Sequence, residues 1–182
     1  MNRVYESHGV RFEYPKDWIL HEQAGHDEVS ITVNSPETSF WSLTLLFHRP
    51  EPDCVIETAL DALRGEYSEI DVYPARDRLG ESRTVARDVD FVCHELIGTS
   101  FLRATRTPRF TLLVIYQGAD FELDETQTML EEVCRSLSWD LKDGANASAD
   151  PDDAEWFEYF WPSQAEPDID ASDEVKTDDA EE

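Results

Sequence analysis

Residues 110–116 read FTLLVIY and include the longest uninterrupted apolar run of the chain, residues 112–116. Side chains along a β-strand point alternately to its two faces, so apolar residues at successive positions predict a strand that is buried on both faces. Leu112 and Val114 would face one side of the sheet, and Leu113 and Ile115 the other. We therefore expect this strand to lie at the centre of a sheet.

Segments before this strand alternate between apolar and polar residues, which is the pattern of strands with one buried face. Such strands are predicted at residues 4–8, 10–14, 29–33, 41–47, 70–73, 84–96 and 100–105. Turns are expected at His8-Gly9, where glycine permits a positive φ, at Gly98 and at Thr107-Pro108. Consecutive strands joined by short turns favour an antiparallel sheet.

Two segments have the three-to-four spacing of amphipathic helices. The first follows Asp53, whose carboxylate is expected to cap the helix N-terminus, and it ends near Gly65. The second is predicted at residues 124–137. Each has one apolar stripe, so both helices should lie on the sheet. The predicted class is α+β, with a mainly antiparallel sheet and two principal helices.

Acidic residues are concentrated at one end of the chain. The whole chain has 15 Lys+Arg and 41 Asp+Glu, a formal net charge of -26. Residues 141–182 contain 2 of these basic residues and 15 of the acidic ones, which is a net charge of -13 and half of the total. A segment of this composition repels itself and offers little for a core. We predict a folded domain at 1–140 and an acidic, largely disordered tail at 141–182.

An aromatic cluster lies inside this acidic tail, where residues 156–161 read WFEYFW. The candidate binding residues are Trp156, Phe157, Tyr159, Phe160 and Trp161. Exposed aromatic clusters reduce solubility and favour association, so an apolar surface should cover this one. That surface belongs either to the folded domain, which makes the cluster a self-latch, or to a partner whose basic rim attracts the flanking acids. A third alternative is that the cluster has no defined role.

Composition also excludes several ligand classes. The negative charge opposes binding to nucleic acid and to anionic membranes and favours a basic protein partner. No apolar leader and no membrane span are predicted. Three widely separated cysteines, Cys54, Cys93 and Cys134, are typical of a reducing cytoplasm. The cysteines and the missing leader favour a cytoplasmic protein. The sequence has no glycine-rich phosphate loop, so we expect no cofactor.

Two pairs of residues could support catalysis. Cys93 and His94 are adjacent, but neighbours on a strand face opposite sides of the sheet, so a structural thiol is the favoured interpretation. Asp88 and Asp90 share one strand face and could act as a paired acid and base. Solvated charges at a sheet edge are the favoured interpretation of this pair.

A metal site could form on the loop that carries His21 and His26, because Asp27 and Glu28 follow at once. The spacing matches no metal-binding signature, and a polar turn has the same composition. We therefore predict no metal site.

Two segments of the chain have a familiar order. One is residues 9–18, which read GVRFEYPKDW, and the other is the strand at 112–116, followed by an acidic loop and a helix that ends VCRSL at 133–137. Together they resemble the PsbP-like superfamily. This superfamily also includes the Ran-binding nuclear import factor and the bacterial DcrB-like proteins. The resemblance covers about residues 3–139 and implies an α/β/α sandwich around a curved antiparallel sheet. It also implies docking onto other proteins rather than catalysis, and it provides no active-site residues to carry over.

The prediction for function is therefore a non-catalytic cytoplasmic protein-binding module, similar to an adaptor or an effector chaperone. Its sheet or helix face would dock a protein with a basic or apolar groove, and the acidic aromatic tail would assist. The alternative is a small hydrolase or metal-assisted enzyme with a carboxylate site such as Asp88 and Asp90, which requires a pocket of converging ionisable groups. Mimicry of nucleic acid by regularly spaced carboxylates is disfavoured, because the tail is expected to be disordered.

Overall fold

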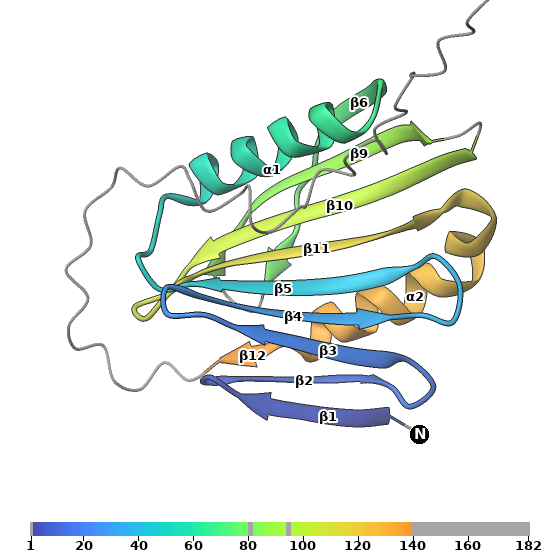
Figure 1. Ribbon diagram of the computed structural model, residues 1–182. Coiled ribbons are helices and arrows are strands. Elements are labelled where there is room, and N and C mark those ends of the chain that lie inside the picture. The colour runs from blue at the N-terminus through green and yellow to red at the C-terminus, as the bar shows by residue number, and fades with distance from the viewer. Residues whose placement is uncertain (1, 80–81, 94–95, 140–182) are drawn as a thin grey trace, which may run out of the picture.

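The computed structural model describes residues 2–79, 82–93 and 96–139. Its middle layer is a seven-stranded antiparallel sheet (Figure 1). In spatial order the strands are β3 (Ile19–Ala24), β4 (Glu28–Asn34), β5 (Phe40–Leu46), β11 (Thr111–Ala119), β10 (Leu96–Arg106), β9 (Val85–Cys93) and β6 (Glu69–Pro74). Helix α1 (Pro52–Glu66) lies on one face of this sheet and α2 (Asp120–Ser136) on the other. The predicted α+β class is confirmed.

A second, three-stranded sheet packs beside α2. It consists of β1 (Asn2–Ser7), β2 (Val10–Pro15) and β12 (Ser138–Trp139), in the order β1-β2-β12. The predicted hairpin turn is present, since His8 and Gly9 have positive φ values of 53° and 79°. A third, two-stranded sheet is formed by β7 (Arg78–Leu79) and β8 (Ser82–Arg83).

Strand β11 is the fourth of the seven strands, as its two-faced apolar pattern predicted. Leu112 and Val114 belong to the core beneath α2 and the small sheet, where the Phe12 and Trp41 rings lie 4.7 Å apart. Leu113 and Ile115 belong to a separate core beneath α1. The sheet thus separates two hydrophobic cores.

Gly98 does not form a turn, which corrects the prediction. It lies inside β10, opposite Phe91 of β9, and the pairing of the two strands continues to Cys93 and Leu96. A Cβ on Gly98 would lie 2.7 Å from a ring carbon of Phe91 and 3.0 Å from the carbonyl oxygen of Gly118. This glycine therefore makes room for an aromatic ring on the neighbouring strand.

Strand β3 was not predicted from the sequence. It is an edge strand of the main sheet, and most of its side chains are exposed. Polar residues His21, Glu22 and Gln23 occupy its middle, so the alternating apolar signal is missing. Main-chain pairing with β4 holds it in place instead.

The helix ends differ from the predictions. Helix α1 begins at Pro52 after the N-cap residue Glu51, so Asp53 lies in the first turn and does not cap the helix. Helix α2 begins at Asp120, one turn earlier than expected. Its first turn is anchored by Glu122, which accepts hydrogen bonds from the loop between β4 and β5.

The proposed boundary between domain and tail is not tested, because residues 140–182 lie outside the described part of the chain. Among the described residues, neither α1 nor α2 has the length and apolar character of a membrane-spanning helix, and no further α-helix occurs.

Candidate functional site

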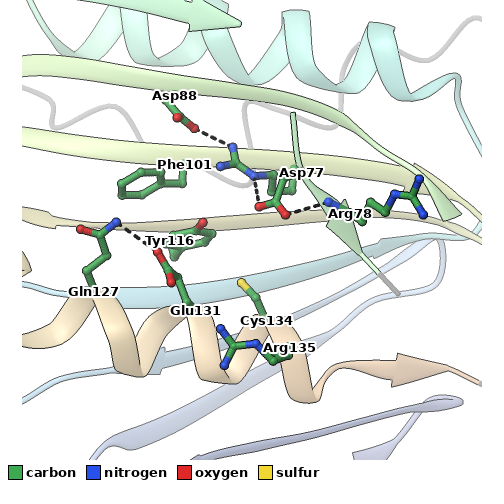
Figure 2. Close-up of a pocket in the computed structure, with 10 residues that line it drawn as sticks. Asp77, Arg78, Asp88, Phe101, Tyr116, Gln127, Glu131, Cys134 and Arg135 are labelled. Atoms are coloured by element: carbon green, nitrogen blue, oxygen red, sulfur yellow. Dashed lines mark hydrogen bonds and ion pairs between the residues drawn. The ribbon is translucent and has the colours of Figure 1, made fainter. Parts of the chain in front are cut away.

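A cavity of about 390 Å³ opens between α2 and strands β9, β10 and β11 (Figure 2). It forms where the sheet extends past the edge of the helix. Polar and charged side chains make up most of its lining, with two aromatic rings and one thiol. The lining residues are Asp77, Arg78, Asp88, Phe101, Arg103, Tyr116, Gln127, Glu131, Cys134 and Arg135.

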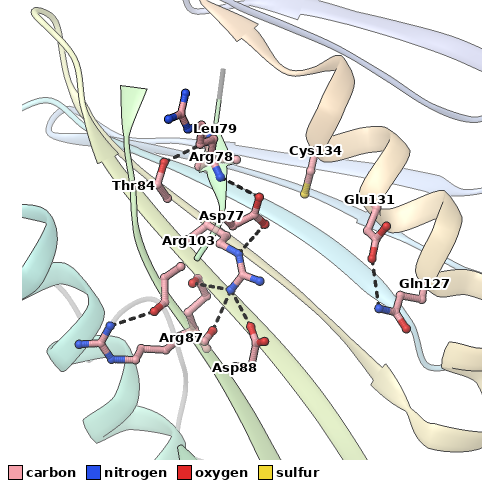
Figure 3. A network of polar contacts seen from close by, with 12 residues as sticks. Asp77, Arg78, Leu79, Thr84, Arg87, Asp88, Arg103, Gln127, Glu131 and Cys134 are labelled. Carbon is pink, nitrogen blue, oxygen red and sulfur yellow. Dashed lines mark hydrogen bonds and ion pairs between the residues drawn. The ribbon is translucent and has the colours of Figure 1, made fainter. Parts of the chain in front are cut away.

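Arg103 of β10 is the buried cation of this cavity, with 4% of its surface exposed. Its Nε donates a hydrogen bond to Oδ2 of Asp77 at 2.9 Å, and its NH1 lies 2.8 Å from Oδ1 of Asp88 (Figure 3). The contact with Asp88 is an ion pair without hydrogen-bond alignment. NH1 also donates to the backbone carbonyl oxygens of Arg87 and Leu102. Two carboxylates and two carbonyls thus offset the cost of burying the guanidinium.

The rings of Phe101 and Tyr116 stack beside this guanidinium. Their centroids are 4.6 Å apart with an interplanar angle of 13°, and the Arg103 Cζ atom lies 5.8 Å from each centroid. Burial raises the pKa of the Tyr116 hydroxyl well above its usual range, although the nearby Arg103 charge opposes this. The Tyr116 hydroxyl is therefore protonated at neutral pH and can donate a hydrogen bond.

Arg103 keeps its charge in this environment. Burial by itself would lower the pKa of the guanidinium, but the interaction with Tyr116 and the contacts with Asp77 and Asp88 outweigh it, and the pKa is raised. The site therefore has a permanent cation and a neutral phenol side by side.

Cys134 of α2 is a structural thiol in this cavity. Its Sγ accepts a hydrogen bond from the indole nitrogen of Trp41 at 3.0 Å. Burial raises the pKa of the thiol to about 12, so the nucleophilic thiolate is scarce at neutral pH. A covalent mechanism through this thiol is disfavoured for that reason.

The charges around the cavity are balanced. Three arginines, Arg78, Arg103 and Arg135, stand against three carboxylates, Asp77, Asp88 and Glu131. Within residues 2–79, 82–93 and 96–139, no three His, Cys, Asp or Glu side chains converge as metal ligands would. The arrangement can bind polar groups, and Arg103 pairs with two of its three carboxylates, Asp77 and Asp88.

Past the cavity, strands β6, β9 and β10 present a surface that we call the exposed sheet face. Residues directly opposite one another in antiparallel strands share a face, and these pairs include Asp71 with Asp90 and Val92 with Ile97. Three of its apolar side chains are well exposed: Tyr73 at 49%, Val92 at 37% and Ile97 at 55%. The exposed sheet face consists of Glu69, Asp71, Tyr73, Asp90, Val92 and Ile97.

The fold can be compared with solved structures. The cyanobacterial PsbP (CyanoP) from Synechocystis sp. PCC 6803 superposes with a TM-score of 0.50 and 15% sequence identity. The superposition covers 76% of this chain and 92% of that chain. This chain has a PsbP-like fold. The resemblance predicted from the two sequence segments is thereby confirmed at the level of the fold.

Two other structures are similar to this PsbP-like fold with lower scores. LpqN of Mycobacterium tuberculosis, which is involved in cell envelope biogenesis, has a TM-score of 0.47 and 12% identity over 76% of this chain and 90% of its own. A protein of Bacteroides thetaiotaomicron has a TM-score of 0.46 and 16% identity over 76% of this chain and 47% of its own. No protein-family model and no curated protein sequence matches the chain.

Asp88 and Asp90 share one face of β9, as predicted, but they have different partners and do not form an acid and base pair. Asp88 contacts Arg103 at the cavity, whereas Asp90 accepts a hydrogen bond from Thr99 at 2.9 Å on the exposed sheet face. Their strand β9 lies between β10 and β6, so the interpretation as edge charges is wrong. Asp88 is needed instead to balance a buried cation.

The other predicted groups do not form a site in the part of the fold that the structure describes. Half-buried Cys93 lies at the end of β9, and His94 and Glu95 lie outside the described residues. His26 pairs with Asp27 at 2.7 Å in an exposed turn, and His21 lies on β3. The aromatic cluster Trp156, Phe157, Tyr159, Phe160 and Trp161 also lies outside the described residues.

The sequence analysis missed Arg103, Asp77 and Tyr116. Asp77 and Arg103 are far apart in the chain, and no spacing rule connects them. One signal was available, because Arg103 follows Leu102 and precedes Ala104 in a strand that is otherwise largely buried. A lone arginine in such a strand indicates a buried ion pair.

Proposed function

We propose that this protein is a non-catalytic protein-binding module that works in the cytoplasm. Its docking surface is the exposed sheet face, and its partner presents a segment in which basic and apolar side chains alternate. The PsbP-like fold supports a binding role. The three cysteines, none of which forms a disulfide, support a reducing compartment.

The observation that carries the proposal is the composition of the exposed sheet face. Tyr73, Val92 and Ile97 leave a substantial part of their apolar surface in solvent. The carboxylates of Glu69, Asp71 and Asp90 share the same face. Apolar side chains surrounded by one sign of charge are typical of a surface that a complementary partner covers.

The cavity favours binding over the alternative hydrolytic function. A carboxylate acid and base would need freedom to exchange protons with a substrate. Asp77 and Asp88 are instead held by Arg103 at 2.9 and 2.8 Å. The Cys134 thiol is protonated, so the cavity offers no activated nucleophile from that residue.

A defined peptide tests the docking surface on the full chain. A short synthetic peptide in which lysine alternates with leucine, labelled with a fluorophore, should bind with a saturable change in anisotropy. The double variant Glu69→Lys with Asp71→Lys should bind it about tenfold more weakly, because the charge complementarity of the face is reversed.

A matched control carries the same change in net charge elsewhere. Glu37 and Glu57 are exposed and lie outside the exposed sheet face. The double variant Glu37→Lys with Glu57→Lys should keep the affinity within about twofold at moderate salt, where distant charges are screened. Equal losses in the two double variants would show that the peptide follows net charge alone, and the proposed surface would be rejected.

The role of the acidic tail needs a separate experiment. Removal of residues 141–182 should change the affinity for the same peptide and leave the unfolding transition of the domain in place, since both described cores lie within residues 5–137. Unchanged affinity would exclude the tail from binding and leave the exposed sheet face as the proposed site.

A further inference from the structure

The cavity contains two hydrogen-bond donors that have no acceptor among the residues that the structure describes. Arg103 contacts its neighbours through Nε and NH1, and Figure 3 shows its third nitrogen, NH2, without a partner among the residues drawn. The Tyr116 hydroxyl likewise has no hydrogen-bond acceptor within the described part of the chain, although only 3% of the residue is exposed. A molecule that enters the cavity can therefore accept a hydrogen bond from each of these donors.

These donors reach the cavity rather than the core. The described polar side-chain atoms that are fully enclosed and unpaired belong to Glu28, Asp88, Ser100 and Gln117, and neither Arg103 nor Tyr116 is among them. The guanidinium and the phenol therefore open into the same space of about 390 Å³. Stacking on Phe101 fixes the tyrosine ring, so the two donors are held in place before any ligand arrives.

Acceptors line the same space. Asp88 uses Oδ1 for its ion pair with Arg103, and Glu131 accepts the side-chain amide of Gln127 on Oε1 at 3.1 Å. The second oxygen of each carboxylate has no hydrogen bond to the described residues and is not enclosed. A ligand can thus accept from Arg103 and Tyr116 while it donates to Asp88 or Glu131.

The electrostatics select an uncharged ligand. A carboxylate ligand at the Arg103 nitrogen would lie close to Asp77 and Asp88, which already neutralise that cation. A cationic ligand would have to approach Arg103 itself. Because the lining has equal numbers of arginines and carboxylates, neither charged ligand recovers its desolvation cost.

We propose that this cavity binds an uncharged small molecule in which a hydrogen-bond acceptor lies beside a donor, as in a primary amide. The acceptor meets NH2 of Arg103 and the hydroxyl of Tyr116, and the donor meets Asp88 or Glu131. An aromatic or other flat body would lie along the half-buried ring of Phe101. This site adjoins the exposed sheet face, because Asp88 lies directly opposite Tyr73, and its ligand goes beyond the proposed protein-binding function.

Three probes of the same shape separate the charge classes: benzamide is neutral, benzoate is negative and benzamidine is positive. Each is titrated into the full chain labelled with ¹⁵N, and the signals of the Arg103 Nε–H and the Gln127 side-chain amide are followed. Benzamide should shift both signals with saturation in the millimolar range, and the two charged probes should bind there about tenfold more weakly. Tighter binding of either charged probe, or no shift with any probe, would overturn the proposal.

Two variants test the assigned donor. Tyr116→Phe removes the hydroxyl and keeps the ring stack, so benzamide should bind about threefold to tenfold more weakly. Tyr14→Phe removes the hydroxyl of another buried tyrosine, in β2 and away from the cavity lining, and should leave the affinity unchanged. Equal affinities for Tyr116→Phe and the unaltered protein would contradict the assignment.

A third variant covers the case in which Tyr116→Phe fails to fold. Gln127 is exposed on α2 at the cavity, so Gln127→Phe can fill the space without disturbing the buried ion pairs. It should abolish the benzamide shift at Arg103, and a persistent shift would place the probe outside the cavity.

Discussion

Arg103 depends on its carboxylate partners for its place in the interior. Asp77 and Asp88 come from a loop and a neighbouring strand, so three separate segments meet at one guanidinium. Removal of the cation leaves two carboxylates that face each other across a half-enclosed space. The residue therefore connects stability with the shape of the cavity.

We expect Arg103→Ala to lower the free energy of unfolding by about 3–5 kcal/mol, because it leaves uncompensated charge near the core. Arg64→Ala is the matched control, since Arg64 forms an exposed pair with Asp61 at 2.6 Å, and it should change stability by less than about 1 kcal/mol. Urea denaturation measures both. Similar small losses in the two variants would show that the Arg103 pairs contribute little.

Glu122, in the first turn of α2, is a second single residue on which stability depends. Ser35 donates to its Oε1 at 2.7 Å, and the backbone amides of Thr38 and Ser39 donate to its Oε2 at 2.8 and 2.9 Å. The Thr38 hydroxyl also donates to Oε2. Burial would raise the pKa of this carboxyl, but the hydrogen bonds outweigh burial and lower it.

This pKa predicts a dependence of stability on pH. Because the folded-state pKa lies below the unfolded value, the ionised Glu122 stabilises the fold above about pH 4.5, and that contribution is lost as the pH falls through the folded-state pKa. Glu122→Gln should be less stable by about 1–3 kcal/mol at neutral pH and should lose less further stability on acidification. Denaturation between about pH 7 and pH 3 measures this difference. The exposed Glu125→Gln should follow the unaltered protein, and a parallel decline in Glu122→Gln would refute the assignment.

At the scale of elements, Gly98 of β10 leaves room for the Phe91 ring of β9 and for the Gly118 carbonyl oxygen of β11. The Phe91 ring leaves no room for a side chain at this position. The same ring stacks on Tyr67, at the end of α1, with ring centroids 4.1 Å apart. The contact therefore joins two strands and the end of a helix.

Gly98→Ala should destabilise the protein by about 1–3 kcal/mol, because the new methyl group overlaps Phe91 and the Gly118 carbonyl. In a Phe91→Leu background the same change should cost less. Gly65→Ala in α1 meets nothing within 4 Å and should stabilise by about 0.5–1 kcal/mol. Thermal unfolding of the variants measures these effects, and equal costs for Gly98→Ala in both backgrounds would exclude the ring as the cause.

These elements show which features can be predicted from sequence. Apolar periodicity predicted the central strand β11 and both helices, because burial on a regular element leaves a regular pattern. The hairpin at Gly9 was predicted from the freedom of glycine to adopt a positive φ. Periodicity did not reveal β3, because main-chain pairing at a sheet edge requires no apolar side chains. The position of Gly98 was predicted wrongly, because the need for a residue without a side chain comes from a ring on another strand. The cavity was missed for the same reason: Arg103, Asp77 and Tyr116 meet only in the folded chain.

At the scale of the whole molecule, negative charge is the dominant electrostatic feature. The net charge is -26, and only a few carboxylates among the described residues form ion pairs with basic side chains. Most of these ion pairs are exposed. Repulsion among distant carboxylates therefore opposes the compact state, and salt screens this repulsion.

Stability should rise by about 1 kcal/mol when NaCl increases from about 10 mM to about 200 mM, since the Debye length shortens over this range. Urea denaturation at a series of salt concentrations measures the slope. The double variant Glu37→Lys with Glu57→Lys should show a smaller slope because it carries less negative charge. A fall in stability with salt would show that attractive pairs outweigh the repulsion.

The central position of β11 has a consequence for the exchange of backbone amide hydrogens with deuterium. Opening the sheet from either edge must release β3, β4 and β5, or β6, β9 and β10, before β11 loses its partners. Residues 112–115 are also buried on both faces of the sheet, by the core beneath α2 on one face and by the core beneath α1 on the other. Their amides should be the last to exchange, at the rate of global unfolding, whereas those of β3 and β6 exchange through local fraying.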